Sequence, residues 1–541
     1  MKKLFLLISF LYCFHVTAQE DAWVFLKDKP NAATFIASPL TMLSQRALDR
    51  RTRHHITLDS KDAPIEATYY NQIKNATGIT VLAKSKWLNA LHVQGTQTNI
   101  NNLKTSFSFV QSIEFADNSL NASGKRLPKS NTITKRNKFA ETTADFNYGN
   151  TKNQTEMLKA DFLHKKNFTG NGMHIAVIDA GFPNVNTLPA FARIRNNNQI
   201  LGGYDFVSRS TNFYSGYKHG TNVLSTIAGY IDGQFVGTAP DASFYLFRTE
   251  DSAKEVPLEE SLWVEAAERA DSLGVDIINT SLGYSTFDES RFNYSYANMD
   301  GNTTFITRGA EIGVSRGMIV VNSAGNEGND AWKYITAPAD AKSVFTIGAV
   351  NSSKVIAPFS SFGPTPDNRI KPDVLAQGQN VFILNEITGD PVTSNGTSFS
   401  SPIMAGIIAC FWQAFPNLTN TQIMQRIRES ADKYSNPTAQ YGYGIPNLET
   451  AYGNVLNVNE QDFIKEISVY PNPVSSTFNL KTATNDLSSL SIQIFNVIGK
   501  KVYEEKSLKS KTIDVSELSS GIYILKIINE TQQKTIKLIK K

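Results

Sequence analysis

The chain has 541 residues, of which 53 are Lys or Arg and 49 are Asp or Glu, so its formal net charge is +4. This length predicts about three folding units, and the 41% of apolar residues excludes a chain that is disordered throughout. Counted by segment, the net charge is +10 over residues 1–139, −11 over 140–466 and +5 over 467–541. The basic residues are dispersed rather than clustered, so we expect no nucleic-acid partner.

The first 18 residues predict a secretory signal peptide. Two lysines precede an apolar run from Leu4 to Phe14, and small residues follow. A membrane span would need about 20 apolar residues, so this run is too short. Removal of residues 1–18 would leave Cys410 as the only cysteine, which excludes an internal disulfide. The apolar neighbours of Cys410 predict a buried thiol.

Residues 19–139 are predicted to form a small α+β domain followed by a basic linker. Short strand-like runs are scattered between residues 23 and 117. From Asn118 to Lys138 the sequence is polar and basic, contains Gly and Pro, and lacks any apolar period. Such a composition is typical of an exposed linker.

Residues 140–457 predict a doubly wound parallel α/β sheet. Apolar runs such as HIAVID and MIVV have the length of strands that are covered on both faces. Between such runs, helices are predicted from Leu258 to Leu273 and from Phe305 to Arg316. In sheets of this kind, ligands bind at the carboxyl ends of the strands.

The last part of the chain has a different pattern. After a linker at residues 458–466, short alternating runs over 467–541 are broken by Pro, Gly, Asn and Ser. This pattern predicts a small all-β sandwich.

Four motifs carry side chains suited to catalysis. Asp179 ends the HIAVID run, His219 precedes a helix in KHGTNV, Asn326 lies in a glycine-rich turn, and Ser398 precedes an apolar helix. A carboxylate can orient a histidine, a histidine can act as a general base, and a serine at a helix N-terminus can act as a nucleophile. An asparagine amide can face an oxyanion. Each motif alone also suits a turn, a cap or a core position. By composition, the rival nucleophiles are Ser394, Ser400 and Ser401.

Taken together, these motifs resemble those of the subtilisin-like serine proteases over about 300 residues, in the order Asp, His, Ser that is known for subtilisin. The resemblance rests on IDAG, HGTNV, SLG, SAGNEG and GTSFSSP. It implies a serine endopeptidase with Ser398 as nucleophile, His219 as general base, Asp179 as the residue that orients the histidine, and Asn326 in the oxyanion hole. It also implies protein or peptide substrates and a monomer. The chemistry requires no cofactor, and the sequence does not locate the structural calcium that the family can carry.

The resemblance also assigns two substrate-binding segments. Ser281, Leu282 and Gly283 match the strand that pairs with the extended substrate backbone. Because backbone pairing reads no side chains, this match implies broad specificity. One wall of the pocket for the residue before the cut is matched by Ser323, Ala324 and Gly325.

The sequence departs from the pattern of the family at three places. Ala180 stands where many relatives carry Ser or Thr, and Asn222 replaces a histidine found in several relatives. The stretch from Tyr284 to Thr304 looks inserted. It could shape the substrate cleft or bind calcium, but we expect it to form a solvated loop.

The flanking parts also resemble known modules. Residues 22–117 are similar to the inhibitory propeptide of subtilases, which implies that the chain inhibits itself and is cut between Asn118 and Phe146. Residues 467–541 resemble the sorting domain of the type IX secretion system through VYPNPV and ELSSGIYILKI. This similarity implies passage through the periplasm, the type IX machinery as a partner, and a secreted or cell-surface protein.

Three alternatives differ in class from these interpretations. The C-terminal sandwich could bind carbohydrate or protein instead of directing export. The central domain could be a catalytically silent scaffold that binds peptides or surfaces, although such a scaffold would not need all four catalytic side chains. A carboxylate-triad peptidase of the same fold is disfavoured, because it would carry Glu in place of the histidine and Asp in place of the oxyanion asparagine.

Overall fold

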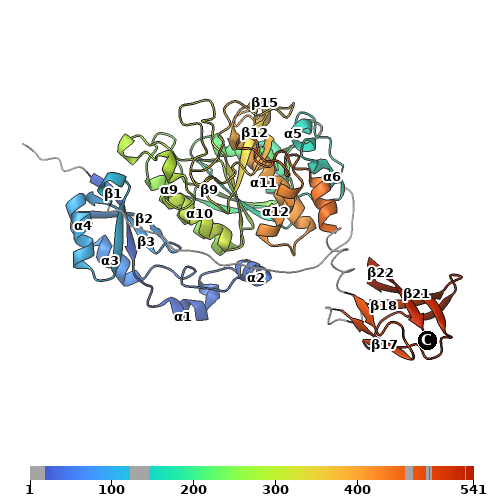
Figure 1. Cartoon of the computed structure of the whole chain (residues 1–541). Coiled ribbons are helices and arrows are strands. Elements are labelled where there is room, and N and C mark those ends of the chain that lie inside the picture. The colour runs from blue at the N-terminus through green and yellow to red at the C-terminus, as the bar shows by residue number, and fades with distance from the viewer. Residues whose placement is uncertain (1–18, 122–144, 457–466, 483–486, 488–489, 530–531) are drawn as a thin grey trace, which may run out of the picture. The chain divides into compact units, whose positions relative to one another are not determined.

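The computed structural model describes residues 19–121, 145–456, 467–482, 487, 490–529 and 532–541 (Figure 1). Its compact units divide between Glu449 and Thr450. The predicted signal peptide, the predicted linker at 458–466 and nearly all of the basic linker lie outside the described residues. In the described part of the chain, no helix is long and apolar enough to cross a membrane.

The N-terminal domain, residues 19–121, is a four-stranded antiparallel sheet with helices, which confirms the predicted α+β class. Two of its helices, α3 and α4, bury Ile73, Ile100 and Leu103 in a core shared with the sheet. The strand order is β2-β3-β1-β4. The elements are β1 (Gln19–Leu26), α1 (Ala32–Ala37), η1 (Pro39–Thr41), α2 (Gln45–Arg53), α3 (Ala67–Lys74), β2 (Ile79–Ser85), β3 (Ala90–Thr96), α4 (Gln97–Ser106), β4 (Val110–Phe115) and η2 (Asn118–Leu120).

The central domain, residues 145–449, contains a sheet of seven parallel strands in the order β13-β12-β11-β10-β5-β9-β6. All residues of the inner strands β10, β11 and β12 are buried, as the continuous apolar runs predict for strands covered on both faces. The predicted doubly wound sheet is therefore confirmed. Its strands are β5 (His174–Asp179), β6 (Ile200–Asp205), β9 (Ser243–Arg248), β10 (Ile277–Thr280), β11 (Ile319–Ser323), β12 (Phe345–Val350) and β13 (Val374–Gln377).

Two pairs of helices pack on this sheet, α8 with α11 and α9 with α10. Helix α9 has the predicted bounds, and α10 ends one residue before the predicted end. Small elements complete the domain. The helices are α5 (Lys152–Glu156), α6 (Ala160–Lys165), α7 (Ala192–Asn196), α8 (His219–Ala228), α9 (Leu258–Leu273), α10 (Phe305–Ser315), α11 (Thr397–Ala414) and α12 (Asn420–Glu429); the small elements are η3 (Pro189–Phe191), η4 (Ser290–Phe292), η5 (Tyr296–Asn298), β7 (Tyr230–Ile231), β8 (Phe235–Val236), β14 (Val381–Leu384) and β15 (Pro391–Ser394).

The N-terminal domain packs against α9 and α10 of the central domain. The indole Nε1 of Trp23 donates to Ser261 Oγ at 2.8 Å, and the indole stacks on Phe305 with ring centroids 4.8 Å apart. Glu268 of α9 accepts from the hydroxyl of Ser85 at 2.6 Å and from the backbone N–H of Trp87 at 2.9 Å. These contacts join the N-terminal and central domains into one compact unit.

The inserted segment from Tyr284 to Thr304 is not the solvated loop that we expected. Tyr284, Phe292 and Met299 are buried, and short η4 and η5 helices divide the segment. The polar residues around these apolar side chains conceal their spacing in the sequence. The segment is therefore anchored to the central domain.

Cys410 lies in α11 and is fully buried, as predicted. Its Sγ donates to the carbonyl oxygen of Thr238 at 3.2 Å. Burial raises the pKa of the thiol well above its usual range, so the thiol stays protonated.

The C-terminal domain, residues 467–541, consists of a three-stranded sheet, β16-β17-β20, and a four-stranded sheet, β19-β18-β21-β22. The pairings within both sheets are antiparallel, and the two sheets share a core that contains Phe478, Ile492 and Leu525. This arrangement confirms the predicted all-β class. The strands are β16 (Ser468–Tyr470), β17 (Thr477–Lys481), β18 (Leu490–Asn496), β19 (Lys501–Glu505), β20 (Thr512–Asp514), β21 (Gly521–Asn529) and β22 (Gln532–Lys540).

Candidate active site

The side chains of Asp179 and His219 form a hydrogen-bonded pair. Asp179 is the last residue of β5 and is fully buried, whereas His219 begins α8 and has a partly exposed ring. His219 Nδ1 lies 2.7 Å from Asp179 Oδ1, which also accepts the backbone N–H of Ala180 at 2.8 Å. Burial alone would lower the pKa of His219, but the Asp179 carboxylate outweighs it and raises this pKa above its usual value of 6.5.

Ser398 lies in the first turn of α11, beside Ser281. The Ser398 hydroxyl donates to the carbonyl oxygen of Ser281 at 3.3 Å, and the Ser281 hydroxyl donates back to the Ser398 carbonyl oxygen at 2.9 Å. In an uninterrupted helix the N–H of the residue four positions on would bond to that oxygen. That residue is Pro402, which has no N–H. The proline thus leaves the Ser398 carbonyl for Ser281.

Asn326 is held next to the start of α11 by Thr397. Its Oδ1 accepts from the backbone N–H of Thr397 at 2.8 Å and from the Thr397 hydroxyl at 3.1 Å. Gly396, with φ 148°, precedes Thr397, and a Cβ at that position would lie 3.7 Å from Ser398 N and 3.8 Å from both Nδ2 and Oδ1 of Asn326. The space that the glycine leaves open is therefore bordered by the backbone nitrogen of Ser398 and by the side-chain amide of Asn326.

The two predicted substrate-binding segments follow the ends of neighbouring strands. Ser281, Leu282 and Gly283 come directly after β10 and line a cavity. The other segment, Ser323–Gly325, begins at the last residue of β11 and touches α11 through Thr397, whose hydroxyl donates to the carbonyl oxygen of Gly325 at 3.0 Å. The segments thus approach Ser398 from two adjacent strands.

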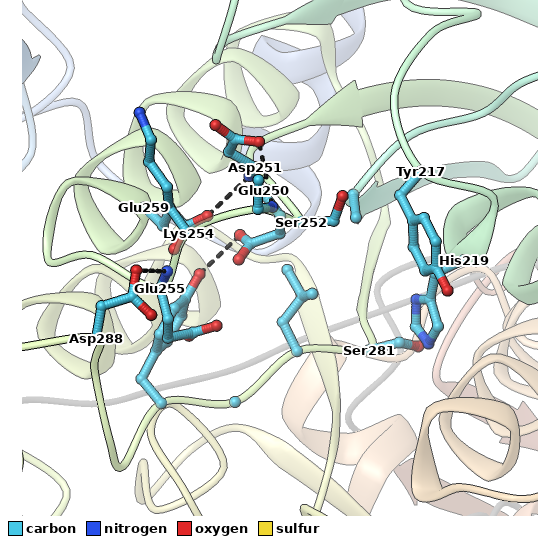
Figure 2. Close-up of a pocket in the computed structure, with 15 residues that line it drawn as sticks. Tyr217, His219, Glu250, Asp251, Ser252, Lys254, Glu255, Glu259, Ser281 and Asp288 are labelled. Carbon is cyan, nitrogen blue, oxygen red and sulfur yellow. Dashed lines mark hydrogen bonds between the residues drawn. The ribbon is translucent and has the colours of Figure 1, made fainter.

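A cavity of about 520 Å³ extends from His219 (Figure 2). Figure 2 shows His219 and Ser281 at one end and a group of carboxylates at the other. The remaining lining comes from Ala180, Tyr217, the segments after β9 and β10, α9 and the inserted segment. The acidic residues of the lining are Glu250, Asp251, Glu255, Glu259 and Asp288.

Three of these carboxyls have raised pKa values. Burial is the main cause in each case, and it raises the pKa of Glu250 to about 8 and that of Glu259 to about 9. For Glu255, burial and the neighbouring Asp288 raise the pKa to about 7. These three carboxyls therefore stay protonated at higher pH than an ordinary glutamate, and the cavity becomes more negative as they ionise.

The sequence pattern did not reveal two features of this site. Thr397 connects Asn326 to α11, and only the fold brings these residues together across the sheet edge. The acidic end of the cavity combines residues 250–259 with Asp288 of the inserted segment, although the acidic stretch DSAKEVPLEE contained a compositional signal. Among the described residues, no three His, Cys, Asp or Glu side chains are grouped so that they could hold a metal ion.

A parallel α/β sheet that carries aspartate, histidine and serine at its carboxyl edge, next to an elongated cavity, has the arrangement of a serine hydrolase. Comparison with known proteins narrows this class. Residues 170–444 match the Subtilase family, residues 21–135 match the Peptidase S8 propeptide domain of Bacteroidota, and residues 468–541 match a secretion system C-terminal sorting domain.

Two subtilisins agree with these matches. Subtilisin NAT of Bacillus subtilis subsp. natto is 34% identical over 302 residues, which cover 54% of this chain and 69% of that protein. Subtilisin of Bacillus pumilus is 33% identical over 302 residues, covering 54% and 96% of the two chains. The solved structure of MycP1 from Mycobacterium smegmatis matches with 24% identity and a TM-score of 0.44, covering 59% of this chain and 89% of that one.

The chain therefore belongs to the subtilase family and is a serine endopeptidase. Its propeptide domain and its sorting domain make it a secreted protease zymogen that is exported to the extracellular space or the cell surface.

The raised pKa of Glu259 predicts a pH-dependent stability. The folded protein keeps this proton up to about pH 9, whereas the unfolded chain loses it near the ordinary value of 4.5. Stability therefore falls as the pH rises between these values. Glutamine cannot ionise, so we expect the melting temperature of Glu259→Gln to increase relative to that of wild type as the pH rises from 5 to 9.

Thermal unfolding of both proteins across this range, in a Ser398→Ala background, measures the effect. The control is Glu449→Gln, at an exposed position. A melting-temperature difference for Glu259→Gln that does not change with pH would contradict the prediction.

Proposed function

We propose that the chain cuts peptide bonds through Ser398, His219 and Asp179, by way of an acyl-enzyme. The observation that supports this most directly is the 2.7 Å hydrogen bond between His219 Nδ1 and the buried Asp179 carboxylate, at one end of a cavity that also contains Ser281, the partner of Ser398. The carboxylate fixes the tautomer of the imidazole, leaving Nε2 as the base.

The first step is attack of Ser398 Oγ on the carbonyl carbon of the substrate. The hydroxyl turns from the Ser281 carbonyl oxygen to His219 Nε2, which takes its proton and later delivers it to the leaving amine. The resulting imidazolium is stabilised by Asp179. A water molecule, deprotonated by the same histidine, then hydrolyses the ester on Ser398.

The negative oxygen of the tetrahedral intermediate lies in the space beside Gly396. There it accepts hydrogen bonds from the backbone N–H of Ser398 and from the Asn326 side-chain amide. The positive end of the dipole of α11 acts in the same direction. Thr397 contributes by fixing Asn326 Oδ1, so that the Nδ2 group is presented to the oxyanion.

The substrate backbone lies along Ser281–Gly283, and the residue before the cut enters the pocket beside Ser323–Gly325. The same chemistry cuts the chain's own linker between Asn118 and Phe146, most of which lies outside the described residues. The N-terminal domain then acts as an inhibitor until it leaves. No cofactor takes part in these steps.

Replacement of the nucleophile is the most direct test. We expect Ser398→Ala to lower kcat for casein or a peptide ester by about 10⁶-fold, to abolish labelling by a fluorophosphonate, and to leave the precursor uncut. Ser400→Ala is the matched control, because Ser400 is buried in the same helix and bonds only to the Thr397 carbonyl oxygen. Equal labelling and processing of Ser398→Ala and wild type would refute the assignment of Ser398 as nucleophile. A wild type that is neither labelled nor processed would instead support the catalytically silent scaffold.

The pH dependence of kcat/KM tests the roles of His219 and Asp179. Only the neutral imidazole can accept a proton, so activity should rise with pH through a midpoint above 6.5, because the pKa of His219 is raised. Asp179→Asn should move this midpoint to lower pH and reduce kcat by about 10⁴-fold. The exposed Asp232→Asn is the control. An unchanged midpoint in Asp179→Asn would refute this assignment.

The oxyanion role of Asn326 makes a separate prediction. Asn326→Ala should lower kcat by about 10²- to 10³-fold, the loss known for such a donor in subtilisin, while KM changes by less than about threefold. The neighbouring Asn329→Ala, at an exposed position, should have no effect. A variant that loses activity through KM alone would show that Asn326 binds substrate and does not stabilise the transition state.

Deletion of residues 467–541 tests the C-terminal domain. We expect the truncated enzyme to accumulate in the periplasm with unchanged hydrolysis of a soluble peptide, since the residues that line the described cavity all belong to the central domain. Cell fractionation followed by a peptide assay measures both properties. Normal export with weaker binding of an insoluble protein substrate would favour the alternative binding module.

A further inference from the structure

Residues 44–62 of the N-terminal domain, which we call the docking arm, contact the central domain at a place separate from the four-stranded sheet. The arm contains α2, which Figure 1 shows apart from that sheet. Two of its arginines, Arg50 and Arg51, are 0% and 2% exposed. A guanidinium group is buried only where its charge and its N–H groups find partners, so the surface beneath the arm must supply them.

The first set of partners is the carbonyl groups at the C-terminal ends of α9 and α10. Arg46 Nε donates to the carbonyl oxygen of Gly274 at 2.9 Å, and Arg51 Nη1 donates to that of Arg316 at 2.6 Å. Arg50 donates to the carbonyl oxygens of Asp271, Val275 and Arg316. The last carbonyls of a helix have no partner within the helix and carry the negative end of its dipole, so arginines are suited to bind them.

Two glycines make room for the arm at these helix ends. Gly274 after α9 and Gly317 after α10 have φ values of 83° and 89°, in the left-handed region that ends a helix. A Cβ at Gly274 would come within 2.7 Å of the Cβ of Arg46. The two helix ends therefore leave space for the docking arm and also present the negative ends of their dipoles to its arginines.

The second set of partners is a network of opposite charges that is buried except at Asp59, whose side chain is 41% exposed. Asp271 of α9 pairs with Arg50 and, at 2.8 Å, with Arg51. In the reverse direction, Arg316 of the central domain pairs with Asp59 at 3.0 Å and with Asp62 at 3.4 Å. The formal charges cancel, three positive against three negative: Arg50, Arg51 and Arg316 face Asp59, Asp62 and Asp271.

We propose that the C-terminal ends of α9 and α10, with Asp271, form an arginine-binding exosite that holds the docking arm. None of these residues lines the cavity beside His219, so the arm binds independently of the active site. Linked binding at two places slows release far more than either contact alone. The exosite therefore keeps the N-terminal domain bound after the linker is cut. Activity begins only when this domain is released. This last consequence rests on the proposed function.

The test uses the full chain with Ser398→Ala, so that no step depends on its own catalysis. A recognition sequence for an added protease is placed between residues 122 and 144, the linker is cut with that protease, and dissociation of the N-terminal fragment from the immobilised central domain is timed. We expect the double variant Arg50→Ala/Arg51→Ala to dissociate at least about 30-fold faster than the parent, because removing one side of a buried charge pair acts mainly on the dissociation rate.

Arg53→Ala is the matched control. Arg53 lies in the same helix, its side chain is 36% exposed, and it lies 3.7 Å from its nearest acidic partner, Asp276. We expect its dissociation rate to change by less than about threefold. Equal dissociation rates for the double variant and the parent would overturn the proposal. If the double variant dissociates faster as expected but the chain with Ser398 restored hydrolyses no substrate, the proposed function is refuted and the exosite proposal still stands.

A synthetic peptide of residues 44–62 decides the matter if the double variant does not fold. Added to the cut parent complex, the peptide should compete for the exosite and speed release of the N-terminal fragment. A peptide with Lys in place of Arg50 and Arg51 should not do so, because the lysine ammonium group lacks the planar, forked guanidinium that can donate to several carbonyl oxygens at once. No acceleration by the native peptide, or equal acceleration by both peptides, would overturn the proposal.

Discussion

The common direction of the seven strands decides where the polar groups of this enzyme meet. In a parallel sheet all carboxyl ends lie at one edge, and covering both faces leaves that edge as the place where polar side chains reach solvent. Asp179 ends β5, Ser281 follows β10 and Ser323 ends β11, so three distant segments of the chain arrive at one line. Helices α8 and α11 pack against each other and begin at this line, which brings His219 and Ser398 to it.

Much of this arrangement could be predicted because short, contiguous stretches of the sequence indicate it. The apolar run HIAVID has the length and character of a buried strand, and β5 occupies it. The helix from Leu258 to Leu273 has clear ends, with Pro257 before it and Gly274 after it, and its predicted bounds agree with the structure. The motifs around Asp179, His219 and Ser398 are short and contiguous, so each could be recognised without knowledge of its neighbours.

The remaining features depend on contacts between distant residues, which no local pattern reports. Judged by composition alone, α2 is an exposed basic helix. The acidic and carbonyl partners that bury Arg50 lie more than 200 residues away along the chain, so no local pattern reports its burial. Likewise, Pro402 within a helix would ordinarily suggest a kink. Its effect here is to free the Ser398 carbonyl for Ser281, and this becomes visible only when the ends of β10 and α11 lie side by side.

The buried thiol in α11 has a consequence for an enzyme that works outside the cell. Cys13 belongs to the predicted signal peptide, and Cys410 is enclosed beneath the sheet with its proton held by burial. Cys410 is a free cysteine, and the described residues contain no disulfide for reducing agents to break. Its buried, protonated thiol offers no nucleophilic sulfur to oxidants, and thiol reagents can reach it only when the core opens. The rate at which a thiol reagent modifies Cys410 therefore reports how often the core of the folded protein opens.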